Sequence, residues 1–206
     1  MRQALGPFEG TAITLYRGLF LSLDELARDI VALGPFKRVL EVGAGDGEVC
    51  NRLNALLPDA EILGIDIADD PGRMFTGDRD RVSFRQVATG DLVLEQPDPF
   101  DLVLLSDILH HVPESERRAL LGDVSALAGL GGTVVVKDWV RDRSLSHTLA
   151  VVGDKYISGD RNVDFLTRDE LRTLLTDALP GRQVRSEFCV PPWHNNVLLV
   201  LEPALR

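Results

Sequence analysis

The chain has 206 residues, a formal net charge of −10, a hydrophobic fraction of 45% and a charged fraction of 26%. This length is enough for one domain with a full hydrophobic core, and the composition is ordinary for a globular protein. Proteins that grip a phosphate backbone normally present a basic face, whereas the arginines here are scattered among acids, which disfavours a nucleic-acid partner. No apolar run approaches the roughly 20 residues of a membrane span, and the start of the chain lacks the pattern of an export signal.

The two cysteines, Cys50 and Cys189, fit no metal-binding or redox spacing. We expect both to be reduced thiols in the core of a cytoplasmic protein. Together with the acidic balance, this favours a small molecule as the partner and predicts no membrane partner.

Two helices are expected before the first strand. Residues 11–20 are apolar with polar interruptions, which is typical of a short helix. Ser22 and Glu25 have the spacing of a capping box, and Gly34 ends the amphipathic helix that this box begins. We expect residues 1–36 to form an N-terminal helical cap.

A glycine-rich turn follows the first predicted strand, in residues 39–48, Val-Leu-Glu-Val-Gly-Ala-Gly-Asp-Gly-Glu. The next apolar residues recur at helical spacing, so the order is strand, turn, helix, which is how a Rossmann-like sheet begins its nucleotide site. Glycine lets a ligand lie against bare backbone, and the helix start favours an anionic group. A dinucleotide fingerprint would need a third glycine at position 48, where Glu48 stands.

An acid ends the second predicted strand, residues 61–65. Asp66 lies about 20 residues beyond Gly45, the spacing at which a carboxylate accepts hydrogen bonds from ribose hydroxyls. Ile67 is then placed to pack on a purine. The alternative is that Asp66 only caps the turn that follows it.

The third predicted strand is residues 82–87, and it follows an irregular stretch at residues 68–81 with turn signals and little periodicity. Gly90 and Asp91 come next and are expected in a loop. From its position alone, Asp91 can be an ordinary loop acid.

The fourth predicted strand, residues 100–105, runs into Ser106, Asp107, His110 and His111. Ligands of open α/β sheets bind at the carboxyl ends of the strands, so we expect these four side chains near the reacting centre. Pro113 is expected to open the next helix.

A fifth strand, residues 133–136, ends at Lys137-Asp138-Trp139. We expect residues 139–166 to form a lid insertion over the site. Thr167 and Glu170 form a second capping box, and residues 183–190 and 196–201 are predicted to be the last two strands.

Three stretches resemble one family. Glu-x-Gly-x-Gly-x-Gly from Glu41 resembles motif I of the class I S-adenosylmethionine-dependent methyltransferases, and Phe-Asp-Leu-Val followed by Leu-His-His-Val-Pro-Glu (residues 100–114) resembles motif IV of their small-molecule members. Residues 131–136, Gly-Gly-Thr-Val-Val-Val, are also similar to the family. The resemblance implies an α/β fold: a Rossmann-like, seven-stranded, mostly parallel sheet with an antiparallel last strand and helices on both faces, within a single domain over residues 1–206.

The resemblance also implies a cofactor site for S-adenosylmethionine, with S-adenosylhomocysteine as the product. Its expected residues are Tyr16, Glu41, Gly43, Ala44, Gly45, Asp66, Ile67, Asp91 and Ser106. In the family an N-terminal segment lies over the cofactor, which is the reason for including Tyr16; a core position is its alternative.

A hydroxyl acceptor must lose a proton during methylation, and histidine is the base best matched to neutral pH. By resemblance to plant-type O-methyltransferases, His110 is the first candidate for this base, although paired histidines recur here in relatives that need none. His111 is the second catalytic candidate, with packing as its alternative, and His147 and His194 rank lower.

The substrate is expected to contact Asp107, Trp139, Tyr156, Trp193 and His194, and core packing is the alternative for the aromatic residues. Metal-dependent catechol methyltransferases carry an acid after strand four and an Asp-Asn pair after strand five. Trp139 stands where that asparagine would be, so one ligand is missing and we expect no metal.

Rival functions remain open at this point: a dehydrogenase that binds NAD, a cyclase or sensor that binds S-adenosylmethionine without methylating, and an RNA or protein methyltransferase. Neither Asn/Asp-Pro-Pro-aromatic nor cysteine follows strand four, which disfavours amino-methylating nucleic-acid enzymes and cytosine-C5 chemistry. The sequence leaves the acceptor and the oligomeric state open.

Overall fold

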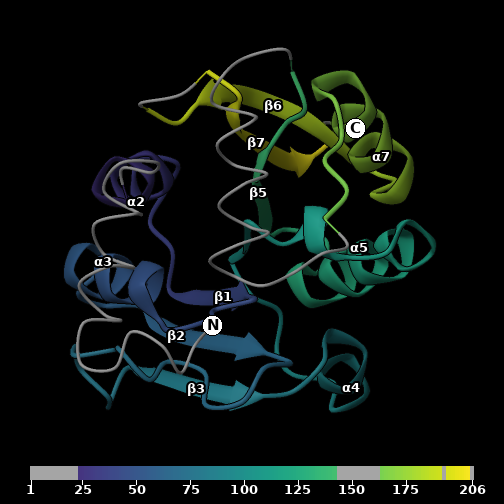
Figure 1. Cartoon of the computed structure of the whole chain (residues 1–206). Coiled ribbons are helices and arrows are strands. Elements are labelled where there is room, and N and C mark those ends of the chain that lie inside the picture. The colour runs from purple at the N-terminus through teal and green to yellow at the C-terminus, as the bar shows by residue number, and fades with distance from the viewer. Residues whose placement is uncertain (1–22, 143–162, 192–193, 205–206) are drawn as a thin grey trace, which may run out of the picture.

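The computed structural model describes residues 23–142, 163–191 and 194–204, and these form one sheet with helices on both faces (Figure 1). The strands are β1 (Arg38–Val42), β2 (Glu61–Asp66), β3 (Val82–Gln86), β4 (Leu102–Ser106), β5 (Thr133–Trp139), β6 (Arg182–Cys189) and β7 (Asn196–Pro203). The helices are α2 (Leu23–Val31), α3 (Glu48–Leu56), α4 (Thr89–Leu94), α5 (Glu114–Ala128), α7 (Arg168–Ala178) and a short 3₁₀ helix, η2 (Leu109–His111).

The strand order is β3-β2-β1-β4-β5-β7-β6. Strands β1 to β5 pair in parallel, and β7 lies antiparallel between β5 and β6. The order therefore reverses between β1 and β4, and the carboxyl ends of the parallel strands share one edge of the sheet, called the carboxyl edge below. Ligands of open α/β sheets bind in the crevice at such a reversal. The topology confirms the expected seven-stranded, mostly parallel fold.

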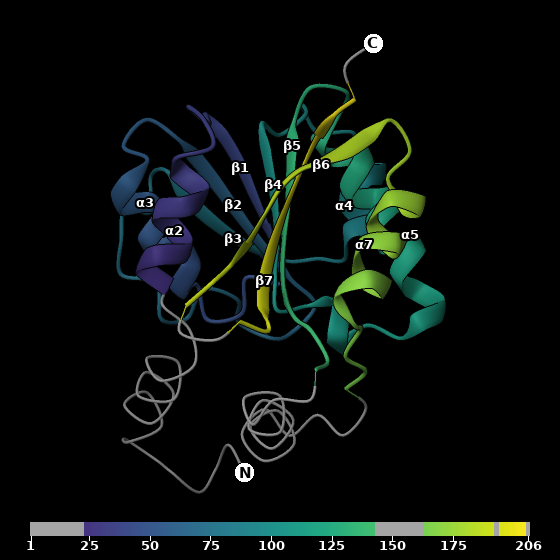
Figure 2. The ribbon, with the colours of Figure 1, turned by 90° about the horizontal axis from the view of Figure 1, so that it is seen from above.

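The sheet is buried on both faces, and Figures 1 and 2 show α2 and α3 on one side with α4, α5 and α7 on the other. Successive side chains of β4 point to opposite faces of the sheet. Leu102 and Leu104 belong to the hydrophobic cluster that includes α2 and α3. Val103 and Leu105 belong to the cluster that includes α5 and α7. Burial on both faces explains why consecutive residues are apolar in β4, over Leu102–Leu105, and in β5, over Val134–Val136, rather than alternating with polar ones.

One expectation about an element boundary is corrected. Gly90 and Asp91 lie in the first turn of α4 rather than in a loop, because Leu92 is buried and the Thr89 hydroxyl donates to Asp123 on α5 at 2.8 Å. Strand β5 ends at Trp139, as predicted, and β7 pairs with it that far.

The predicted capping box at the start of α7 is confirmed: the Thr167 hydroxyl accepts from the backbone N–H of Glu170, whose carboxylate accepts from the backbone N–H of Thr167. Pro113 precedes α5 as its N-cap and is not its first residue. Cys50 is buried as expected, whereas Cys189 ends β6 at the surface, so its prediction as a core thiol is wrong.

The predicted box residue Ser22, residues 1–22 of the N-terminal cap and residues 143–162 of the lid lie outside the described residues. The cap, the lid and the single domain stay predictions. Among the helices that the structure describes, none combines the length and apolar character that a membrane span requires.

A substitution of Gly132 tests the close packing before β5. A Cβ at this position would collide with the carbonyl oxygens of Phe100 and Ala128, and backbone cannot move aside as a side chain can. We expect Gly132→Ala to lower the free energy of unfolding by about 1 to 3 kcal/mol, measured by urea denaturation. The neighbouring Gly131→Ala is the control, since nothing lies within 4 Å of its Cβ position. Equal stability of the two variants would contradict this packing.

Candidate active site

The glycine-rich turn between β1 and α3 has positive φ at Gly43 (73°), Gly45 (53°) and Gly47 (89°). A Cβ on Gly43 would lie 2.6 Å from Cδ1 of Ile108, and one on Gly47 would crowd the backbone of Gly72, so packing requires both glycines. At Gly45 the nearest described atom would be the Gly43 oxygen, 4.0 Å away. Gly45 is therefore the place where bare backbone is left open to a ligand.

Asp66, at the carboxyl end of β2, joins this turn to the next one. Its Oδ2 accepts from the backbone N–H of Gly45 and its Oδ1 from that of Ala68, both at 2.8 Å. Each carboxylate oxygen can accept a second hydrogen bond, so the turn-capping role and the ribose-binding role are compatible. Beside it, the side chain of Ile67 is 78% exposed and offers an apolar surface for a purine. The residues present fit an adenosine group.

Glu41 lies beneath the turn. It is buried, and its Oε2 accepts from Sγ of Cys50 on α3 at 2.8 Å. Burial, followed by the charge of Glu41 and its hydrogen bond, raises the pKa of the Cys50 thiol well above its usual value, so the thiol keeps its proton and donates. The structure thus gives Glu41 a role in tying β1 to α3, and its contact with a cofactor stays a prediction.

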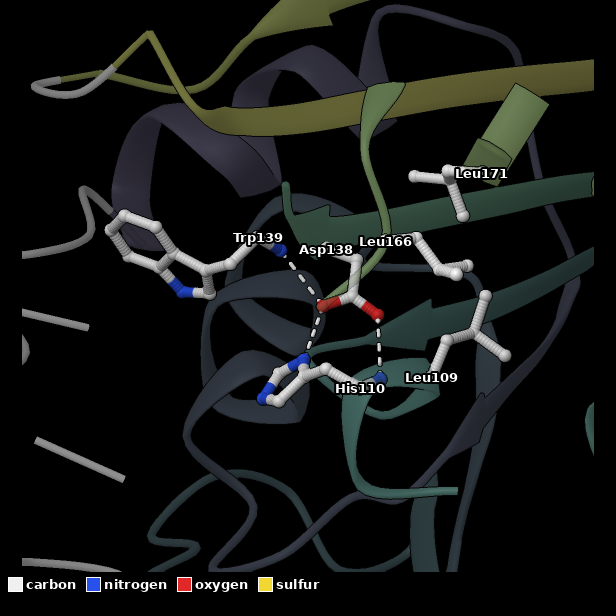
Figure 3. Close-up of a pocket in the computed structure, with 6 residues that line it drawn as sticks. All are labelled: Leu109, His110, Asp138, Trp139, Leu166 and Leu171. Atoms are coloured by element: carbon white, nitrogen blue, oxygen red, sulfur yellow. Dashed lines mark hydrogen bonds and ion pairs between the residues drawn. The ribbon is translucent and has the colours of Figure 1, made fainter. Parts of the chain in front are cut away.

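His110 and Asp138 form a buried pair at the carboxyl edge (Figure 3). Nδ1 of the imidazole contacts Oδ1 of the carboxylate, and the backbone N–H of His110 donates to Oδ2 at 3.3 Å. The backbone N–H of Trp139 also donates to Oδ1, at 2.8 Å. This carboxylate fixes both the position and the orientation of the imidazole ring.

The pKa of Asp138 lies below its ordinary value. Burial pushes this pKa upward, but the charge and hydrogen bond of His110, the charge of Lys137 and the Trp139 N–H together outweigh it. Asp138 is therefore an ionised carboxylate in a buried site.

A second ion pair lies beside the first. Nζ of Lys137 is 2.5 and 2.6 Å from the two carboxylate oxygens of Asp107, and the backbone N–H of Asp107 donates to the Lys137 carbonyl at 2.9 Å. Asp107 has a φ of 58°, a left-handed conformation that few non-glycine residues adopt. We call Asp107, His110, Lys137 and Asp138 the charged cluster.

Ligand atoms of Asp107, His110 and Asp138 all lie within 4.8 Å of one another, which is close enough for them to share a metal ion. Both oxygens of Asp107 already hold the Lys137 ammonium, and Asp138 holds His110. These contacts support the expectation of no metal, which stays a prediction.

The His110 ring is enclosed by its neighbours. It stacks on Phe165 with a centroid distance of 4.9 Å and an interplanar angle of 14°, and the His111 ring is tilted against it at 4.1 Å. Leu109, Leu166 and Leu171 also lie beside the pair (Figure 3). The imidazole is thus held within an apolar wall.

The chain is similar in sequence to known methyltransferases. The model of a family described as "Methyltransferase domain" matches residues 40–134. A ubiquinone biosynthesis O-methyltransferase of Xanthomonas campestris is 31% identical over 175 residues, which cover 80% of this chain and 71% of that relative. The chain belongs to the class I S-adenosylmethionine-dependent small-molecule methyltransferases. It is an enzyme, and S-adenosylmethionine is its methyl donor.

Solved structures agree with the fold of the methyltransferase. An O-methyltransferase family protein from Burkholderia thailandensis superposes with a TM-score of 0.72 at 17% identity, covering 96% of this chain and 58% of that one. The magnesium protoporphyrin IX methyltransferase of Synechocystis, solved with bound SAH, gives a TM-score of 0.65 at 17% identity over 96% of both chains.

The structure brings together some of the predicted site residues of the methyltransferase and not others. Ser106 ends β4 beside Lys137 in the β4–β5 register. Trp139 is mostly buried, packed with Phe165, whereas Asp91 on α4 and His194 are exposed. Outside the described residues lie Tyr16, Tyr156, Trp193 and the lower-ranked His147.

Three buried polar residues near the carboxyl edge are not given a binding or catalytic role by the sequence. The sequence identifies Asp138 only as a possible metal ligand and assigns no role to Lys137, although Lys137 is a charged residue that directly follows three valines. Asn196 is fully buried opposite Trp139, and its side-chain amide has no hydrogen-bond partner among the described residues. The sequence predicts that Asn196 begins the last strand, but it does not predict that its side chain is buried.

Replacing Asp66 tests the cofactor site. We expect Asp66→Ala to weaken the binding of S-adenosylmethionine about 10- to 100-fold in calorimetry, because hydrogen bonds to a charged group are lost and the Gly45 turn is loosened. Asp69→Ala, which changes an exposed acid in the following turn, is the control and is expected to bind normally. Unchanged affinity in Asp66→Ala, with the fold intact, would refute this site.

The lowered pKa of Asp138 gives a stability prediction. The ionised carboxylate stabilises the fold above its ordinary pKa of about 4, and this contribution is lost as the pH falls through the lower native pKa. We expect Asp138→Asn to be about 2 to 4 kcal/mol less stable than the wild type near neutral pH. In urea denaturation at decreasing pH, this gap should narrow below about pH 4.

Asp177→Asn provides the control, since Asp177 forms an exposed pair with Arg118 at 3.2 Å. Exposed pairs contribute roughly 0 to 1 kcal/mol, so we expect little change. A gap for Asp138→Asn that stays constant with pH would contradict the charge-based account.

Proposed function

We propose that this methyltransferase transfers the methyl group to a hydroxyl oxygen of a small molecule, with His110 as the general base. The observation that carries the proposal is the buried His110–Asp138 pair, which lies where β4 and β5 end. The name O-methyltransferase, carried by the relatives at about 30% identity, supports oxygen as the accepting atom.

The donor supplies a methyl group on a positively charged sulfur, which is already activated for displacement. The protein's contribution is therefore to position the acceptor and to remove its proton. With Nδ1 of His110 donating to Asp138, Nε2 carries the ring's lone pair, a tautomer assigned from the hydrogen-bond network. Nε2 takes the proton of the acceptor hydroxyl as the new carbon–oxygen bond forms and the methyl–sulfur bond of the donor breaks, with S-adenosylhomocysteine as the leaving group.

Asp138 supports this step after the proton has moved. An imidazolium in a buried site is costly unless an opposite charge is close, and the Asp138 carboxylate provides that charge at Nδ1. The stacked Phe165 ring and the buried Leu109 limit the entry of water around His110. Water exclusion strengthens the interaction between the imidazolium and the carboxylate.

The charges of the cluster favour a neutral acceptor. Two carboxylates and one ammonium leave one net negative charge while His110 is neutral. This charge repels a carboxylate or phosphate on the acceptor, and it is cancelled when His110 takes up the proton. We therefore propose an uncharged alcohol or phenol as the acceptor. The net charge of −10 likewise supports a small-molecule enzyme without a nucleic-acid partner.

The experiment that tests this function is incubation with S-adenosylmethionine carrying a deuterated methyl group and a panel of phenols, alcohols, amines and carboxylic acids. We expect the label on oxygen of a neutral phenol or alcohol, detected by mass spectrometry. Label only on nitrogen or carbon would refute O-methylation, and binding of the donor without any labelled product would favour a non-methylating protein.

Replacement of His110 tests the base. We expect His110→Gln to lower kcat about 10²- to 10⁴-fold with unchanged affinity for the donor, because binding is left intact while proton removal is lost. The acidic limb of the pH–rate profile, which reports the base, is expected to disappear. His111→Gln is the matched comparison, and a larger loss of kcat there would transfer the catalytic role to His111.

A further inference from the structure

Lys137 is a fully buried cation near the carboxyl end of β5. Its side chain is 0% exposed, and it follows three consecutive valines in β5. A lone ammonium in such a place would lose its proton or destabilise the fold, so it must be compensated by charges of opposite sign. The side chains that compensate it are those of the proposed acceptor site.

The contacts of the ammonium are those of a cation in a binding site. Nζ lies 2.5 and 2.6 Å from the two oxygens of Asp107 and 5.3 Å from the centre of the Trp139 ring. The charge of Lys137 also acts on Asp138. Ligand atoms of Asp107, His110 and Asp138 lie within 4.8 Å of one another. Two carboxylates and an imidazole are a donor set that divalent cations accept.

We propose that the Lys137 ammonium is the built-in cation of the acceptor site, in the place where this donor set would otherwise hold a divalent metal ion. The ammonium pairs with both oxygens of Asp107, and its positive charge adds to that of His110 beside Asp138. Lys137 is therefore a positioning residue, which acts on the acceptor through Asp138 and His110.

The surroundings of the pair argue against a purely structural role. Replacing a buried ion pair by apolar side chains is often neutral or stabilising, so stability alone does not require a lysine in β5. Its partner Asp107 is partly exposed at the carboxyl edge and has a left-handed backbone, and strain of this kind collects at functional sites. The pair is also continuous with the His110–Asp138 pair.

The kinetic consequence of this inference rests on the proposed function, but its binding consequence does not. Without the ammonium, Asp107 and Asp138 present two uncompensated carboxylates beside His110, and a divalent cation can neutralise them. The Lys137→Met variant is therefore expected to gain a metal site that the wild-type chain lacks. Binding of Mn²⁺ can be measured whether or not an acceptor has been found.

The experiment compares the wild type, Lys137→Met and Lys37→Met by titration with Mn²⁺, followed by electron paramagnetic resonance and by thermal denaturation. Lys37 is the matched control, because it forms an exposed pair with Asp59 at 3.3 Å, away from the charged cluster. We expect Lys137→Met to bind one Mn²⁺ at least about tenfold more tightly than the other two proteins, and to melt at a higher temperature with Mn²⁺ than without it.

Activity gives a second readout once an acceptor is known. We expect Lys137→Met to have a lower kcat than the wild type and to recover part of it when Mn²⁺ is added. Lys137→Arg keeps the positive charge, so we expect Mn²⁺ to leave its kcat unchanged. A structural role for Lys137 would produce no recovery by a metal. If the wild type methylates no acceptor, the proposed function is refuted. The role of Lys137 as the cation of this site is then still tested by the Mn²⁺ titration.

Two results would overturn the inference. One is a folded Lys137→Met chain with no gain in Mn²⁺ affinity over Lys37→Met, and the other is a wild type that binds Mn²⁺ as tightly as Lys137→Met. If Lys137→Met unfolds without metal, cooperative melting restored by Mn²⁺ supports the inference. A chain that stays unfolded in Mn²⁺ counts against it.

Discussion

The architecture of the site depends on the cost of burying charge at the carboxyl ends of β4 and β5. Asp138, His110 and Lys137 are all nearly inaccessible to water, so each must find its partner within the protein. The pairs Asp138–His110 and Asp107–Lys137 satisfy this requirement, and they fix the orientation of the imidazole at the same time. Stability and the proposed chemistry therefore draw on the same contacts.

The charged cluster and the glycine-rich turn between β1 and α3 are connected by close packing. Gly43 leaves the space that Ile108 fills, so the turn after β1 and the loop after β4 are in direct contact. The reversal of strand order between β1 and β4 makes that contact possible. A donor resting on Gly45 and an acceptor facing His110 would thus be held by two loops that brace each other, which suits an in-line transfer that depends on alignment.

The buried Arg117 stabilises the segment that contains His110 through hydrogen bonds to backbone carbonyls. Nε of Arg117 donates to the carbonyls of Leu109 and Val112 at 3.0 and 2.9 Å, and its guanidinium donates to the Asp164 carbonyl at 2.8 Å. The backbone N–H of Asp164 donates in turn to the His110 carbonyl at 2.9 Å. Because Arg117 satisfies carbonyls from η2 and from the segment before α7, it joins the two stretches that enclose the imidazole.

The sequence by itself determined the features that depend on neighbours along the chain. Apolar periodicity gave the strands and helices, the alternating glycines marked the turn, and Thr167 with Glu170 marked the start of α7. The acid after β2 could also be recognised, because its distance from the glycines is set by one strand–helix–strand unit. The prediction of a loop at Gly90 was wrong, because buried contacts place this residue in α4 despite its preference for turns.

Only the tertiary structure decided which charged groups face each other. His110 and Asp138 are 28 residues apart and Asp107 and Lys137 are 30, and the parallel register of β4 with β5 brings them together. Neither spacing nor periodicity carries this register, because it results from the packing of whole strands. The identity of side chains at the carboxyl edge was therefore readable in the sequence, and their pairing was not.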